Sequence, residues 1–210
     1  MKNLSKADVL VVNGGGMEGY LDDVIAAYPD LPIVDTFEYL DLDEENSHIW
    51  MSEALYASQL KAIAEGLSEL DSVNADTYAI NAEGFISYMN ENIDKQGLDE
   101  TLKGANVAIL HEAFEYTALS LGANVVATMD LDEERQVSAG EVKEFIDSIT
   151  ENNVSIVFAE YDYGNAMGAL IEEQTDAKVV YLETLVHGTY SGYDYVDVLN
   201  SNYIKILTHI

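Results

Sequence analysis

Apolar residues along the chain repeat with two different periods, and the change between them outlines a succession of strands and helices. Short runs rich in Val and Ile are typical of strands, whereas apolar residues three and four positions apart are typical of helices. Strands are predicted over residues 9–13, 33–34, 105–110, 123–128, 154–159 and 178–182. Helices are predicted over residues 18–28, 49–70, 75–93 with an extension to 102, 113–121, 138–151, 165–174 and 195–207.

Most of the predicted strands are separated by helices, and this order indicates an α/β protein with mainly parallel sheets. The order is interrupted once, where the helical patterns 49–70 and 75–93 follow one another with no strand between them. We interpret this interruption as the place where one lobe of the protein ends and a second lobe begins.

The composition is that of a globular protein, with 48% apolar and 23% charged residues among 210. The longest apolar runs are of strand length, and no basic segment followed by an apolar one predicts a signal peptide in this chain. The absence of cysteine excludes disulfides, thiolate catalysis and cysteine-based metal sites. A bound metal would therefore be held by histidines and carboxylates.

The chain is strongly acidic, with 39 Asp and Glu against 9 Lys and Arg and a formal net charge of −30. Such a charge repels phosphate backbones and anionic lipid headgroups, so we expect no nucleic acid and no membrane surface as partner. The same charge concentrates cations near the protein. A solubility requirement or a salty environment is the simpler explanation of the charge.

A glycine-rich turn, Gly14-x-Gly16-x-x-Gly19, follows the first predicted strand, and Asp35 ends the next one. This spacing is that of a dinucleotide-binding fingerprint, in which a pyrophosphate lies at a helix N-terminus and an acid binds the ribose. Glu18 and further acids crowd this turn with no Lys or Arg nearby, and they would repel a pyrophosphate. We expect a tight strand-to-helix turn and keep nucleotide binding as an alternative.

Histidines and acids stand at the ends of several predicted elements. His111, Glu160 and Glu183 each directly follow a predicted strand, and His48 directly precedes a predicted helix in the other lobe. Ligand sites in open parallel sheets gather at the carboxyl ends of strands, so His111 and Glu183 are expected to face one crevice. Two imidazoles and a carboxylate suit Zn²⁺, or Mn²⁺ where oxygen ligands dominate. A hydrogen-bonded histidine or a helix-capping acid is the alternative for each residue taken alone.

Several segments, in order along nearly the whole chain, carry a resemblance to one family. LSKADVLVVNGGGMEGYL at 4–21 is similar to "sKADlvv-NG-g-lE-wl", and NSHIWM at 46–51 is similar to "NPHIWLdP". Further similar segments are LHEAFEY at 110–116, FAE at 158–160, LETL at 182–185 and a closing helix at 195–206. These patterns resemble the cluster A-I solute-binding proteins, the zinc- and manganese-binding components of bacterial ABC importers.

The resemblance implies a ligand set for the metal ion. His48 and His111 correspond to the imidazole ligands of the family, and Glu183 stands in place of its ligand aspartate. The implied ion is Zn²⁺, with Mn²⁺ as the alternative. Trp50, the only tryptophan, is expected to pack beside the ligand loop and to hold His48 in place.

The resemblance also implies two parallel-sheet lobes joined by one long helix. We place an N-terminal lobe over residues 1–72, a linking helix over 73–103 and a C-terminal lobe over 104–210. The family begins with a further strand and a loop bearing another histidine, and this chain lacks both. We therefore expect an incomplete N-terminal lobe.

The departure from the family changes what is expected of the site. One ligand is missing, and water, His187 or a partner chain would complete the coordination. The missing strand leaves a sheet edge open, which predicts a homodimer through that edge. An acidic loop at 41–45 stands where zinc-binding members often carry a His-rich loop, and Ser47 replaces a proline.

The predicted function is that of a receptor that binds a divalent metal ion between two lobes and delivers it to an ABC importer permease. Such a protein is not an enzyme, and the family places it outside the cytoplasm, in the periplasm or lipid-anchored at the cell surface. One alternative is a metal-dependent hydrolase in which Glu112 or Glu160 acts as the base. Another is a non-binding, truncated scaffold or adhesion-type homologue.

Overall fold

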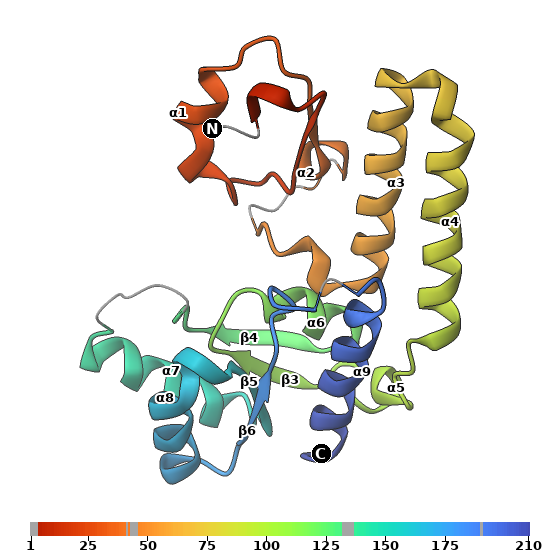
Figure 1. Ribbon diagram of the computed structural model, residues 1–210. Helices are drawn as coiled ribbons and strands as arrows, with labels where there is room; N and C mark the ends of the chain where they lie inside the picture. Colours follow the sequence, from red (N-terminus) through yellow and green to blue (C-terminus); the bar gives the residue numbers. More distant parts are fainter. Residues whose placement is uncertain (1–3, 41, 43–45, 132–136, 190) are drawn as a thin grey trace. The chain divides into compact units, whose positions relative to one another are not determined.

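The computed structural model describes residues 4–40, 42, 46–131, 137–189 and 191–210. Its internal contacts divide the chain into two compact units, Met1–Glu91 and Asn92–Ile210. Each unit combines a parallel β-sheet with helices (Figure 1), which confirms the predicted α/β class. The predicted division at residues 72 and 103 stays a prediction.

The first unit contains a small sheet and a pair of long helices. Its strands β1 (Leu10–Val12) and β2 (Ile33–Asp35) pair in parallel, and they are the two strands of this sheet among the described residues. Its helical segments are η1 (Leu4–Lys6), η2 (Gly19–Leu21), α1 (Asp22–Ala26), α2 (Thr36–Leu40), η3 (Ile49–Met51), α3 (Glu53–Leu70), η4 (Ser72–Asn74) and α4 (Ala75–Asn92). The homodimer predicted through the edge of this sheet stays a prediction.

Helix α3 is fixed at its start and packs closely on the small sheet. Ser52 has extended backbone angles and its hydroxyl accepts a bond from the Leu55 N–H, as expected for an N-cap residue. Farther along, Gly66 faces Val34 of β2, and a Cβ at Gly66 would lie 2.7 Å from the Val34 methyl groups. The missing side chain therefore allows the helix and the strand to approach each other.

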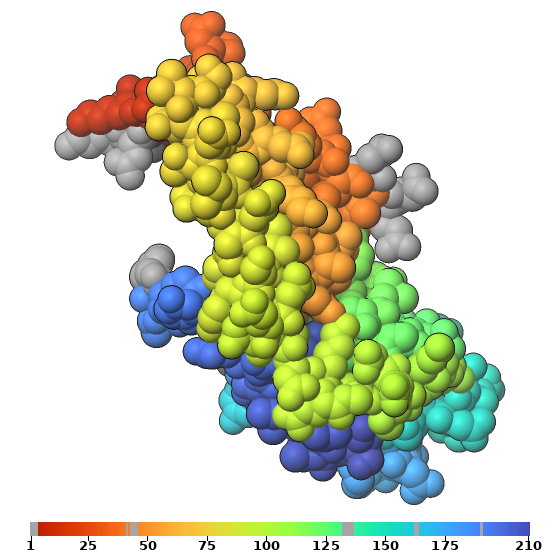
Figure 2. Space-filling view, turned by 90° about the vertical axis from the view of Figure 1, so that its right-hand side faces the viewer, coloured from red at the N-terminus to blue at the C-terminus, as the bar shows by residue number. Residues whose placement is uncertain are grey.

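Helix α4 leaves much of its surface to solvent. Figure 2 shows this exposed face, coloured yellow to yellow-green. Ile80 on α4 and Val73 in the preceding turn are exposed, whereas Met89 near the end of the helix is buried. The polar turn before α4 is held by Asp71, which accepts bonds from Asn74 and Tyr78.

The second unit is built on a four-stranded sheet. Its strands are β3 (Asn106–Ile109), β4 (Asn124–Thr128), β5 (Ile156–Glu160) and β6 (Lys178–Leu182). They lie in the order β4-β3-β5-β6, and every pair is parallel. Helix α5 (Leu98–Thr101) precedes them, and the helices between and after them are α6 (Phe114–Ser120), α7 (Ala139–Glu151), α8 (Tyr161–Gln174) and α9 (Asp194–Leu207).

The core of the second unit fills both sides of β3 and β5. Residues 156–159 are all buried, which agrees with a central parallel strand that is apolar throughout. Phe145 and Ile149 of α7 and Ile171 of α8 belong to the same apolar cluster as Val157. This packing holds the carboxyl ends of the strands in fixed positions.

Several of the predicted helices differ from the structure: the pattern 18–28 divides into η2 and α1, and α8 begins at Tyr161 rather than at 165. The pattern over 49–70 contains a short 3₁₀ turn, and α3 begins only at Glu53 because Ser52 caps it. The extension of the second pattern to 102 is wrong, since α4 ends at Asn92 and α5 is separate. Gln96 and Gly97 have positive φ angles of 52° and 80°, which a right-handed helix excludes.

No helix in the described part of the chain is long and apolar enough to cross a membrane.

Candidate metal centre

His48 is positioned by the residue two places before it in the first unit. The side-chain oxygen of Asn46 accepts a bond from the backbone N–H of His48 at 3.1 Å and lies 3.0 Å from its ring nitrogen Nδ1. His48 is only 8% exposed. Asn commonly bonds the backbone two residues on, and here it also holds the imidazole.

These two bonds determine which ring nitrogen of His48 carries the proton. The backbone N–H can only donate, so the Asn46 atom that it meets must be the oxygen, which can only accept. Nδ1 faces the same oxygen and therefore carries the hydrogen. In the neutral ring, Nε2 then has the lone pair that a metal ion requires.

Trp50 packs against His48, as predicted. The ring centroids are 5.2 Å apart and the planes are tilted by 54°. The indole therefore limits the rotation of the imidazole that Asn46 orients.

His111 is oriented in the second unit by a carboxylate. It follows β3 and is 7% exposed, and its Nδ1 lies 2.9 Å from Oε2 of Glu160 at the end of β5. The second carboxylate oxygen, Oε1, accepts a bond from the Thr184 hydroxyl at 2.9 Å. A carboxylate accepts, so Nδ1 of His111 carries the hydrogen and the buried Nε2 carries the lone pair. Both candidate imidazoles are thus held in the same tautomer.

Glu183 directly follows β6, and its side chain contacts Lys205 on α9. Its carboxylate is 57% exposed and forms an ion pair with Lys205 at 3.3 Å. Its backbone is held by the buried side chain of Asn202, which accepts from the Glu183 N–H and donates to the Glu183 carbonyl. The carboxylate beside His111 is Glu160, because β3 and β5 are neighbours in the sheet.

The predicted ligand set stays a prediction. His48 belongs to the first unit, and His111 and Glu183 belong to the second. Within the described residues of either unit, no three His, Asp or Glu side chains form a group that could hold a metal ion. The acidic loop 41–45 lies outside the described residues except for Leu42.

The other two histidines occupy different environments. His187 lines a pocket of about 350 Å³ together with Glu183 and Thr184, so it lies beside the predicted site in the second unit. His209 is exposed, and its Nδ1 lies 2.7 Å from the carbonyl oxygen of Lys205 at the end of α9.

The glycine-rich turn binds a carboxylate of its own chain. Oε1 of Glu18 accepts a bond from the Asn13 N–H at 2.8 Å, and Oε2 accepts from the Gly14 N–H at 3.0 Å. Asp35 caps α2 by accepting from the backbone N–H groups of Phe37 and Glu38. The groups that a nucleotide would need are engaged, which argues against the nucleotide alternative.

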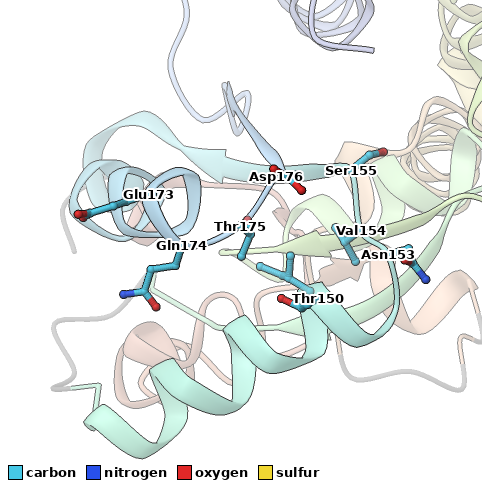
Figure 3. Close-up of a pocket in the computed structure, with 9 residues that line it drawn as sticks. Thr150, Asn153, Val154, Ser155, Glu173, Gln174, Thr175 and Asp176 are labelled. Carbon is cyan, nitrogen blue, oxygen red and sulfur yellow. The ribbon is translucent and has the colours of Figure 1, made fainter.

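A larger pocket of about 530 Å³ lies at the amino ends of strands β5 and β6 in the second unit. Ser155 and Asp176, which precede β5 and β6, line it together with the ends of α7 and α8. Figure 3 shows that its polar side chains diverge, with Glu173 and Asn153 pointing away from each other. The pocket therefore does not offer a converging set of ligands.

The sequence of this chain is similar to those of metal-binding transport proteins. Residues 1–208 match the family model described as zinc-uptake complex component A, periplasmic. The manganese-binding lipoprotein MntA of Halalkalibacterium halodurans is 22% identical over 95% of this chain and 70% of its own length. The iron-binding protein YfeA of Yersinia pestis is 25% identical over 97% of this chain and 66% of its own length.

Among solved structures, the SBP FpvC of P. aeruginosa in complex with a Ni²⁺ ion matches with a TM-score of 0.84. It is 24% identical in sequence, and the match covers 99% of this chain and 80% of that one. This likeness shows that the two chains share a fold.

Proposed function

The chain belongs to the family of the periplasmic component A of zinc-uptake complexes, and we propose that it is the metal-binding receptor of an ABC importer. In this role it binds a divalent cation and presents it to a membrane permease. The family is one of transport components rather than enzymes. The net charge of −30 supports the proposal, because it raises the local concentration of cations.

The observation that carries the proposal is that the rings of His48 and His111 are held in the same tautomer. An oxygen acceptor holds Nδ1 of each ring, Asn46 for His48 and Glu160 for His111. Metal-binding histidines characteristically donate their other ring N–H to such an acceptor, which fixes the tautomer and raises the basicity of the ligating nitrogen. We therefore assign Nε2 of both rings to the metal ion.

The carboxylate of the site comes from the end of β5 or β6. Glu183 is the carboxylate that the family resemblance assigns, and to reach an ion shared with His111 it would leave Lys205. Glu160 already lies against His111 and is mostly buried. We propose that Glu160 orients His111 and that Glu183 completes the coordination, with His187 as a further candidate in the adjoining pocket.

The proposed ion is Zn²⁺, with Mn²⁺ as the alternative. Two imidazoles favour Zn²⁺, and each carboxylate or water that joins them shifts the preference towards Mn²⁺. The relatives named above are described as binding manganese and iron, and the family model is named for zinc. We also propose an extracytoplasmic location with a lipid anchor, because MntA is described as a lipoprotein.

The test is metal binding by the purified chain. We expect elemental analysis to find a divalent metal in the wild-type protein, and calorimetry to show that His48→Ala and His111→Ala bind Zn²⁺ and Mn²⁺ far more weakly. His209→Ala is the matched control, because His209 is exposed. Binding to the native state also raises the melting temperature. A wild-type chain with no metal and no thermal shift would overturn the proposal.

A further inference from the structure

Two buried side-chain amides connect helix α3 to the segment that carries His48. Gln59 on α3 is 8% exposed, and its Nε2 donates to Oδ1 of Asn13 at 2.9 Å. Nδ2 of Asn13 donates in turn to the carbonyl oxygen of Ser47 at 2.9 Å, directly before His48. Two hydrogen bonds thus join three segments that are distant in the sequence.

The direction of each bond is determined by its partners. The carbonyl oxygen of Ser47 can only accept, so Asn13 must turn its nitrogen towards it and its oxygen towards Gln59. The Thr36 hydroxyl donates to the carbonyl oxygen of Asn13 at 2.8 Å and therefore accepts from Gln59 at 2.9 Å. Gln59 must present its nitrogen to both partners, and this holds Asn13 in the orientation that binds Ser47.

The backbone of Asn13 is itself anchored. Its N–H donates to Glu18, and its carbonyl oxygen accepts from the Phe37 N–H at 2.9 Å in addition to Thr36. The side chain of Asn13 is therefore a fixed donor for the carbonyl oxygen of Ser47. Residues 46–48 form neither helix nor strand, so their conformation depends on such contacts.

We propose that Gln59 and Asn13 are positioning residues for His48. By holding the main chain at Ser47, they keep the imidazole where Asn46 can orient it, so that little ordering is left to occur when the ion binds. The inference rests on the proposed function for the part that concerns the metal. The part that concerns the His48 segment can be tested in the metal-free chain.

The experiment compares Gln59→Met with the wild type, and with Ser58→Ala as the matched control on the same helix. Ser58 is more exposed, and its hydroxyl donates to the Ala54 carbonyl within α3. Three quantities are measured by NMR and calorimetry: hydrogen exchange of the His48 amide, the ¹⁵N shifts of both imidazoles, and Zn²⁺ affinity. We expect Gln59→Met to speed His48 exchange and to weaken Zn²⁺ binding by about 10-fold each, the scale of one lost hydrogen bond.

The ¹⁵N shifts separate positioning from general stability. We expect the His48 ring in Gln59→Met to show a mixture of tautomers, while the His111 ring and the Ser58→Ala variant match the wild type. Unchanged His48 exchange and ring shifts in folded Gln59→Met would overturn the inference. If that variant does not fold, Gln59→Glu decides by the same readouts, because a carboxylate cannot donate to Asn13. A wild type that binds no Zn²⁺ while His48 still responds would overturn the proposed function and support the positioning role.

Discussion

Glu160 and His111 are neighbours through the sheet rather than through the sequence: they are 49 positions apart in the chain, and Oε2 of the carboxylate lies 2.9 Å from Nδ1 of the ring. This contact joins the ends of β5 and β3, which pair in register. Thr184 binds the other carboxylate oxygen, so the acid cannot turn away without losing a second bond.

The first prediction concerns the charge of Glu160. Glu160→Gln keeps an oxygen for His111 but removes the negative charge that strengthens the ring as a ligand. We expect Zn²⁺ affinity to fall by about 10- to 100-fold, the usual effect of losing a group that orients a ligand, with little change in unfolding free energy. Calorimetry measures this, with Glu144→Gln on the exposed side of α7 as the control. Unaltered affinity in Glu160→Gln would contradict the role given to this carboxylate.

The second prediction concerns Asn46. Asn46→Ala removes the oxygen that accepts from both the backbone and the ring of His48, so the ring can adopt either tautomer. We expect Zn²⁺ binding to weaken by about 10-fold or more. Asn46→Asp retains an accepting oxygen and is expected to restore most of the affinity. Equal affinities for the two variants would mean that this oxygen does not position the ring.

The third prediction concerns pH. Bonds from Asn74 and Tyr78 hold the pKa of Asp71 below its ordinary value of 3.8, and the bond to Asp71 raises the pKa of Tyr78 above 10.0. The contribution of Asp71 to stability is present above its ordinary pKa and is lost as the pH falls through the lowered value. The contribution of Tyr78 is present below its ordinary pKa and is lost as the pH rises through the raised value.

Tyr78→Phe removes the bond between the two groups. We expect it to lower the urea midpoint across the neutral range and to reduce the pH dependence at both ends. Tyr20→Phe, in which the lost hydroxyl belongs to a highly exposed side chain, is the control. If the urea midpoint of Tyr78→Phe follows the wild-type pH profile, the bond between Tyr78 and Asp71 does not contribute to stability.

The fourth prediction compares two glycines. Gly14 has a φ of 84°, and a Cβ there would lie 1.9 Å from Oδ1 of Asp35, the atom that caps α2. Gly14→Ala is therefore expected to destabilise the protein by more than about 1 kcal/mol.

Gly84 is the matched control, because it lies inside α4 with nothing near the position of its missing Cβ. Gly84→Ala is expected to stabilise the protein by about 0.5–1 kcal/mol. Chemical unfolding measures both changes. Opposite signs are the expected result, and equal effects would mean that the geometry at Gly14 imposes no strain.

Local patterns in the sequence predicted much of the fold. The apolar runs predicted the six strands of the described residues to within a few residues, and the helix predicted from 138 begins at the capping box of Ser138 and Glu141. Helix α2 was missed because five residues are too few to show a period. The break after α4 was missed because Asn200, from the last helix, bonds the backbone at Asn92 and Asp94.

The candidate site was predictable in its residue types but not in its contacts. His48 and Trp50 are close in sequence, and their packing was expected correctly. The pairing of His111 with Glu160 depends on strand order, which no local pattern contains. The bonds of Gln59 and Asn202 likewise depend on which helix packs where. The side-chain amides of Gln59 and Asn202 are buried, and their structural roles can be recognised only when the fold is known.

The position of Glu18 bears on how glycine fingerprints are used to classify proteins. Its carboxylate accepts bonds from the N–H groups of Asn13 and Gly14 at the start of the turn, so these donors are already engaged within the loop and are not available to a phosphate. Pattern searches that compare only the glycines would assign such a chain to the nucleotide binders. An acid placed two residues after the middle glycine is a simple criterion for rejecting that assignment.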